Sequence, residues 1–168
     1  MTLLLRNLQK TVVFDLPKLK TDINLLRRIF RTERYDLGVI CMEDGQLREM
    51  NKMYRGRNEP TDVLSFPSHE SLAPGRLPDP WSDLADLGDI FLGMPYIQKQ
   101  CELDGTDVDT VLPVLVTHGI CHLIGYKHES EEQFRQMLKK ESDILKEYNK
   151  ITNSNLKPLT KNVESQYH

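Results

Sequence analysis

The feature that most constrains this chain is the eleven-residue segment HGICHLIGYKH, from His118 to His128. Two histidines four residues apart lie on one face of a helix, where they can share one metal ion. Gly125 then allows the backbone to leave the helix in a left-handed conformation and to bring His128 back as a third ligand. Three neutral imidazoles with an open fourth position are typical of a catalytic zinc site, since a structural site has a fourth protein ligand.

The same spacing occurs in the metallopeptidase signature HExxHxxGxxH, but Gly119 stands where that signature has its general-base glutamate. Peptide cleavage needs a group that takes a proton from water and passes it to the leaving amine. Phosphodiester cleavage instead requires neutralisation of charge on the non-bridging oxygens, which arginine does well. Arg55, in the segment NKMYRGRNEPTDVLSFP, is the first candidate for that cation, and we interpret Arg57 as a surface arginine.

Other residues near or like the histidines have simpler interpretations. Cys121 lies about 100° around the helix from His122, so we expect a small core residue rather than a ligand. His69 and His168 are interpreted as solvent-facing. Three cysteines without a CxxC motif indicate reduced thiols in an intracellular compartment.

Local patterns predict about four strands and about five helices. The strands are expected over residues 3–8, 35–42, 63–66 and 87–92, and the helices over 17–30, 46–54, 95–103, 108–124 and 131–148. Pro113 lies inside the fourth helical pattern, so we place the true start of that helix close to it. Because strands and helices do not alternate regularly, the pattern favours a single α+β domain with a mixed sheet.

Length and composition agree with one globular domain. The chain has 168 residues, and no stretch approaches the roughly 20 apolar residues of a membrane span, so we expect no membrane partner. We expect the domain to cover residues 1–150 and a polar, frayed C-terminal tail to cover 151–168.

Charge is distributed unevenly, although the net charge is only −3. Residues 1–57 hold 12 Lys/Arg against 7 Asp/Glu, whereas the remainder is acidic. A cluster of arginines falls within about two turns of the first predicted helix: Arg27, Arg28, Arg31 and Arg34. This cluster is either a solvated helix face or a patch that binds a phosphate backbone.

Three segments resemble the signatures of the YbeY family of single-strand-specific endoribonucleases. HGICHLIGYKH resembles its signature H-G-x-x-H-L-x-G-Y/F-x-H, while YRGRNEPTDVLSFP and LGDIFLG resemble its second and third signatures, in the family's order and spacing. The resemblance covers roughly residues 1–150. The openings LLLRNLQ and DLGVICM are most similar to animal members, which are mitochondrial.

The resemblance implies an α+β fold with a zincin-like metal site and one zinc ion per chain. It implies His118, His122 and His128 as metal ligands, and Arg55, together with His118, as catalytic residues. It also implies a role in ribosomal RNA processing and ribosome biogenesis, with single-stranded RNA and a small-subunit ribosomal protein as partners. The implied location is mitochondrial, without a clear presequence, and otherwise cytoplasmic. Lys127 departs from the aspartate usual in bacterial members, which leaves the ligands unchanged but removes any role for an acid there.

Several assignments stay open. Asp89 is either a carboxylate that orients a ligand histidine or a solvent-facing edge residue. Thr61, Asp62 and Ser65 either line the groove or act as capping and turn residues. Two other functions compete: a non-catalytic, zinc-containing ribosome assembly factor, and a metallopeptidase that recruits a distant glutamate.

Overall fold

The computed structural model describes residues 2–70 and 72–160, and within them the chain forms four strands and five helices. In chain order these are β1 (Leu3–Asn7), α1 (Leu16–Ile29), β2 (Asp36–Met42), α2 (Asp44–Arg55), β3 (Val63–Pro67), β4 (Asp86–Gly93), α3 (Met94–Asp104), α4 (Val108–Leu123) and α5 (Glu131–Thr152). The expected single α+β domain, with its four-stranded sheet and five helices, is confirmed.

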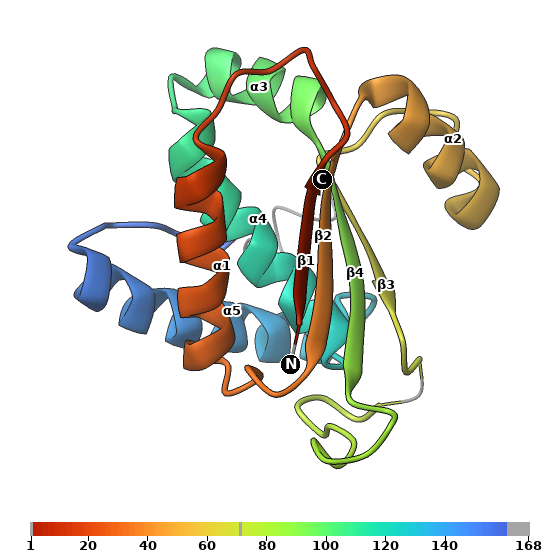
Figure 1. Cartoon of the computed structure of the whole chain (residues 1–168), viewed down its shortest axis with the longest axis vertical. Helices are drawn as coiled ribbons and strands as arrows, with labels where there is room; N and C mark the ends of the chain where they lie inside the picture. The colour runs from red at the N-terminus through yellow and green to blue at the C-terminus, as the bar shows by residue number, and fades with distance from the viewer. Residues whose placement is uncertain (1, 71, 161–168) are drawn as a thin grey trace.

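The sheet has the strand order β1-β2-β4-β3, in which β1, β2 and β4 are parallel and β3 is antiparallel to β4. Helices α1, α4 and α5 lie on one face of the sheet, whereas α2 lies toward the other (Figure 1). The sheet is therefore mixed, as expected, and β3 forms the edge beside which α4 passes.

Two apolar clusters hold these layers together. The large one lies between the sheet and the three helices on its first face, and it includes Val39 of β2, Ile90 of β4 and Ile120 of α4, all 0% exposed. The small one joins α2 to the second face through Ile40, Leu47 and Leu64. Every residue of α4 from Leu112 to Cys121 is buried, so this helix is a fixed platform for whatever its C-terminal half carries.

Helix α4 begins at Val108, so our expectation of a start near Pro113 was wrong. A proline inside a helix removes the hydrogen bond to the carbonyl four residues earlier, here that of Asp109. The ammonium of Lys18, on α1, donates to this carbonyl oxygen at 3.0 Å. A neighbouring helix thus supplies the donor that the proline lacks, and α4 continues through it.

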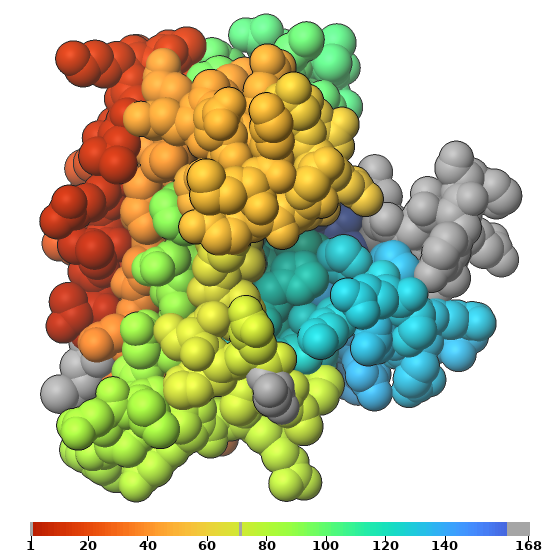
Figure 2. All heavy atoms as spheres, turned by 90° about the vertical axis from the view of Figure 1, so that its right-hand side faces the viewer, coloured from red at the N-terminus to blue at the C-terminus, as the bar shows by residue number. Residues whose placement is uncertain are grey.

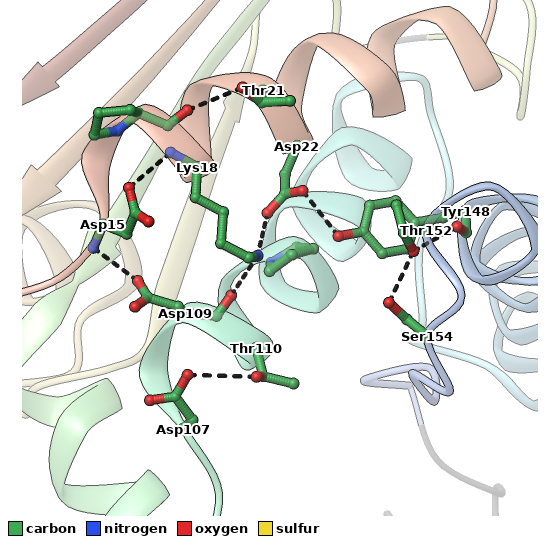
Figure 3. A network of polar contacts seen from close by, with 12 residues as sticks. Asp15, Lys18, Thr21, Asp22, Asp107, Asp109, Thr110, Tyr148, Thr152 and Ser154 are labelled. Atoms are coloured by element: carbon green, nitrogen blue, oxygen red, sulfur yellow. Dashed lines mark hydrogen bonds and ion pairs between the residues drawn. The ribbon is translucent and has the colours of Figure 1, made fainter.

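Lys18 belongs to a partly buried polar network that joins α1, α4 and α5 (Figure 3). The carboxylate of Asp22, which is 6% exposed, accepts from Lys18 Nζ at 2.6 Å and from the hydroxyl of Tyr148 at 2.9 Å. The backbone N–H of Asp15 donates to the Asp109 carboxylate at 2.9 Å. Because a buried charge is tolerated only when it is paired and hydrogen-bonded, this network fixes how the three helices meet.

The structure changes the interpretation of the arginine cluster. Arg27 is 6% exposed, and its guanidinium donates to the carbonyl of Tyr35 at 2.9 Å, so it has a structural role. Arg34 lies beyond the end of α1 with its guanidinium 4.0 Å from the ring centroid of Trp81. For Arg27, both of our alternatives, a solvated helix face and a phosphate-binding patch, were therefore wrong.

The segment after α5 also differs from our expectation. Helix α5 continues to Thr152, and the side chain of Asn149 then binds both backbone groups of Leu156, accepting at 2.9 Å and donating at 3.0 Å. Leu156 and Leu159 pack against the large cluster. Residues 150–160 are thus not frayed, and His168 lies outside the described residues. None of the helices in residues 2–70 and 72–160 combines the length and apolarity needed to cross a membrane.

Candidate metal centre

The three histidines of HGICHLIGYKH converge at the C-terminal end of α4. His118 and His122 project from the same face of the helix, and His128 follows the turn after it. One ring nitrogen from each of the three lies within 4.8 Å of those of the other two, so the cluster can hold a metal ion. The structure thus brings together all three of the expected ligands.

The hydrogen bonds of two histidines direct their Nε2 atoms toward a common point. Nδ1 of His118 lies 3.3 Å from Oε1 of Glu141, and Nδ1 of His122 lies 3.0 Å from the carbonyl oxygen of Tyr126. These oxygens accept hydrogen bonds, so each Nδ1 carries the proton and each Nε2 presents a lone pair. The two Nε2 atoms are 3.1 Å apart.

This separation fits a shared cation. Two facing lone pairs repel one another, whereas ligand nitrogens about 2.0–2.1 Å from a tetrahedral ion are about 3.3 Å apart. Burial, together with the neighbouring His118 and His128, lowers the pKa of His122 to about 3. Burial likewise lowers the pKa of His128. Both rings are therefore neutral near pH 7, which is the form that binds metal.

Gly125 makes the turn that returns His128 to the cluster. Its φ is +101°, which side-chain-bearing residues rarely adopt, and a Cβ there would lie 2.9 Å from the carbonyl oxygen of Leu72. The backbone N–H of Gly75 donates to the carbonyl of Ile124 at 2.9 Å, which ties the loop before β4 to the same turn. The turn is thus held from outside as well as by its own glycine.

Gly119 faces the sheet and not the open side of the cluster. A Cβ built there would lie 2.8 Å from Cδ1 of Ile90, on β4. A side chain at this position would therefore enter the contact between α4 and the sheet. The residue that replaces the peptidase glutamate has a packing reason to be glycine.

The histidines open into a pocket of about 480 Å³ between β3, the end of α2 and the end of α4. Figure 2 looks onto this side of the molecule, where the yellow α2–β3 segment faces the teal and cyan segment that carries the histidines. The lining residues are Arg55, Thr61, Asp62, Val63, Leu64, Ser65, Pro67, His118, His122, Tyr126, Lys127, His128, Glu129 and Leu159. The pocket thus brings Arg55 to the same cavity as the three histidines, although 63 residues separate it from His118.

Arg55 is the last residue of α2, and Gly56 ends that helix in a left-handed conformation with φ +68°. The positive charge of Arg55 contributes to lowering the pKa of His122 and of His128. Arg55 also lines a neighbouring pocket of about 280 Å³ with Asn51, Arg57 and Tyr96. Arg57 is largely exposed, in agreement with its interpretation as a surface residue.

The open assignments around the pocket can now be resolved. Thr61, Asp62 and Ser65 line it, and Asp62 also accepts from the backbone N–H of Val63 at 2.8 Å, so groove and turn roles coexist. Lys127 lines the pocket as well and adds a cation where bacterial relatives were expected to carry an acid. Cys121 is 0% exposed, and burial raises the pKa of its thiol, which confirms it as a core residue.

Asp89 does not orient a ligand histidine. It is exposed on β4, an interior strand, in register with Gly38 and Phe66, while Glu141 and the carbonyl of Tyr126 hold the two Nδ1 atoms. Of our two alternatives for Asp89, the solvent-facing one is right about its exposure, but the residue lies on an interior strand and not at an edge.

Sequence reasoning missed Glu141, although a signal was present. The buried face of α5 is Phe134, Met137, Glu141, Ile144, Leu145 and Tyr148, so a carboxylate occupies an apolar position of a regular helical pattern. Thr160, which binds the same carboxylate, gave no such signal. His69 lies apart from the cluster, with Nε2 2.9 Å from the carbonyl oxygen of Leu84.

Comparison with known proteins assigns this arrangement to one family. A family model described as Endoribonuclease YbeY matches residues 6–149. A human protein named Endoribonuclease YbeY is 44% identical over 162 residues, covering 96% of each chain. A protein of the same name from Halalkalibacterium halodurans is 37% identical over 116 residues, covering 68% of this chain and 72% of its own.

A solved structure has the same fold. The solution structure of TM1509 from Thermotoga maritima aligns with a TM-score of 0.54 at 23% identity, covering 95% of this chain and 100% of that protein. At this identity the likeness extends to the fold alone.

Proposed function

The chain belongs to the YbeY endoribonuclease family, and we propose that it is a zinc-dependent endoribonuclease that cleaves single-stranded RNA. The human relative, which this chain matches over nearly its whole length, is named an endoribonuclease, and this supports RNA as the substrate. The observation that carries the proposal is the shared pocket of Arg55 and the three histidines, since phosphodiester hydrolysis needs both a metal and a cation for the phosphate.

The donor set favours zinc, one ion per chain, because three neutral imidazoles with an open position suit its tetrahedral preference. When bound, zinc would supply a Lewis acid for the phosphoryl oxygens and lower the pKa of a coordinated water.

The chain's own residues would hold the RNA. The Arg55 guanidinium presents a fork of N–H donors that matches two oxygens of one phosphate, and it stabilises charge that develops during cleavage. Lys127, on the opposite wall of the pocket, adds a second positive charge for an adjoining phosphate. Arg55 therefore acts as a catalytic residue and His118 as a metal ligand of the same reaction.

The cellular role proposed is ribosomal RNA processing during ribosome biogenesis, with a small-subunit ribosomal protein as partner. The similarity to the human protein supports a mitochondrial location. The role is tested by mapping ribosomal RNA ends in mitochondria that hold only the Arg55→Ala chain. Accumulation of unprocessed ends supports a role in processing, and normal ends exclude it.

The activity is tested with purified Arg55→Ala protein and a single-stranded RNA labelled at one end. We expect cleavage to fall by about 10²–10³-fold while one zinc per chain is retained. Arg48→Ala is the matched control, because Arg48 is exposed on the same helix and lines neither pocket. Unchanged cleavage by Arg55→Ala would remove Arg55 from the mechanism.

The same preparation separates the competing functions. An assembly factor without catalysis would leave the RNA intact in the wild-type protein and would still support ribosome maturation as Arg55→Ala. A metallopeptidase would cleave casein in a chelator-sensitive manner and leave RNA intact. The orientation of Gly119 toward Ile90 speaks against the peptidase, because a general base cannot be provided from that position.

A further inference from the structure

Behind His118 lies a carboxylate that the reaction described above does not use. Glu141 is 0% exposed on α5, and its Oε1 lies 3.3 Å from Nδ1 of His118 and 3.3 Å from the backbone nitrogen of Thr160. Its other oxygen, Oε2, is buried without a hydrogen-bond partner among the residues that the structure describes. Glu141 is therefore a buried carboxyl group whose two oxygens are only partly satisfied by the described residues around it.

Packing alone does not explain this residue. Its neighbours on the buried face of α5, Met137 and Ile144, are apolar, and an apolar side chain would complete that face without an unpaired oxygen. A buried carboxylate costs folding free energy unless an opposite charge or several hydrogen bonds offset it. The hydrogen bonds to Oε1 offset part of this cost, and a cation bound nearby would supply the opposite charge.

The neighbouring histidines indicate where such a cation would bind. Three neutral imidazoles leave the full double charge of a bound divalent cation uncompensated, in a pocket wall that is largely buried. The imidazole ring of His118 separates Glu141 from the site where the cation would bind, since Glu141 lies beside Nδ1 of that ring. A carboxylate that accepts from Nδ1 of a ligand histidine fixes the tautomer and orientation of the ring and makes it a stronger ligand.

We propose that Glu141 is a positioning residue for the metal: it holds His118 with Nε2 toward the ion and offsets part of the ion's charge. Thr160 is the second point of attachment. Its N–H donates to the Glu141 carboxylate, and its Oγ1 lies 3.3 Å from Nδ1 of His118. The C-terminal segment thus holds the carboxylate against the ring that it orients.

Glu141→Gln tests the proposal, because glutamine keeps the shape and one acceptor but removes the charge. Zinc affinity of the full chain, measured by competition with a chromophoric chelator and no RNA, should fall about 10–100-fold. The thermal midpoint of the metal-free protein should stay unchanged or rise, since a buried charge has been removed. Glu147→Gln, an exposed change on the same helix, should alter neither quantity.

The two readouts separate positioning from a purely structural role. A structural Glu141 predicts that the metal-free midpoint falls and that zinc affinity is unchanged once the protein is folded. The proposal would be overturned if folded Glu141→Gln bound zinc with wild-type affinity. It would also be overturned if the free energy of zinc binding fell by no more than the stability of the metal-free protein.

The wild-type protein gives a test that needs no variant. In ¹⁵N-labelled, zinc-bound chain, the ring of His118 should be protonated at Nδ1 and bound to zinc through Nε2, with the Nδ1 proton shifted downfield by the carboxylate. Zinc on Nδ1, or an Nδ1 proton without that shift, contradicts the proposal. Because no RNA is used, these results are independent of whether Arg55 functions in cleavage.

Discussion

The backbone N–H of Thr160 donates to the carboxylate of Glu141 at 3.3 Å, so the segment after α5 closes the rear of the histidine cluster. Its neighbour Leu159 lines the pocket from the same side. The C-terminal segment is therefore part of the metal centre, although its polar sequence suggested a frayed tail.

Truncation tests this relationship. A chain that ends at Asn149 lacks Thr160, Leu159 and the backbone partner of the Asn149 side chain, so we now expect weaker zinc retention and a lower thermal midpoint. A chain that ends at Thr160 retains these contacts and is the control. Stoichiometric zinc in the shorter chain after dialysis, measured by elemental analysis, would restore our first interpretation of the tail.

Removal of one ligand tests the three-histidine centre. We expect about one zinc ion per wild-type chain and none in His118→Ala, because two histidines hold the ion too weakly to survive dialysis. His69→Ala should keep it, since His69 lies apart from the cluster and contacts the carbonyl of Leu84. Full zinc content in His118→Ala would refute the three-ligand arrangement.

The buried imidazole of His122 predicts acid sensitivity of the metal-free protein. Its pKa is about 3 in the folded state and about 6.5 when unfolded, so the unfolded chain takes up the proton first as pH falls. The stability contributed by the neutral ring is therefore present above pH 6.5 and is lost progressively toward pH 3. Urea unfolding at several pH values measures this, and His122→Phe should flatten the curve; an equally steep decline in that variant would assign the effect to other groups.

Two glycine substitutions separate packing from helix propensity. Gly119→Ala places a methyl group 2.8 Å from Cδ1 of Ile90, so we expect the free energy of unfolding to fall by about 1–3 kcal/mol. Gly45→Ala, on α2, meets nothing within 4 Å and should be neutral or stabilising. Chemical denaturation measures both. Equal changes in the two variants would mean that the space between α4 and the sheet accommodates a methyl group at position 119.

The polar network between α1, α4 and α5 lies far from the pocket, so we expect a substitution in it to lower stability without affecting the metal site. Tyr148→Phe removes a donor to Asp22, and a buried carboxylate left short of one hydrogen bond should lower the free energy of unfolding by about 1–3 kcal/mol. Zinc content should not change. Lys139→Ala breaks an exposed ion pair with Asp143 and should leave stability within error. A neutral Tyr148→Phe would show that solvent replaces the missing donor.

Sequence patterns predicted those parts of the fold that depend on neighbours along the chain. The strands and helices follow from apolar periodicity, and the histidine cluster follows from helical spacing plus one glycine. Predictions failed where a residue distant in the sequence alters the local structure that the neighbouring residues favour. Pro113 does not start α4 because Lys18, from another helix, binds the carbonyl that the proline leaves free.

The same reason explains the errors around the site. Arg27 was grouped with its neighbours by spacing, yet the chain after α1 turns back and covers it. Asp89 was considered as one possible carboxylate for a histidine because it lies in the LGDIFLG segment. Glu141 was not considered, because it comes from a helix whose other acidic residues are exposed. Proximity of Arg55 to the histidines required the edge strand β3 to lie beside α4, which no single segment specifies.

The separation between His118 and Thr160 also sets an order of events during synthesis. Thr160 lies 42 positions after His118, so the three histidines of the cluster are synthesised before the residue that donates to Glu141. Until then the Glu141 carboxylate lacks the hydrogen bond from the backbone N–H of Thr160. The hydrogen bonds around the candidate metal centre can therefore be complete only after translation has passed residue 160.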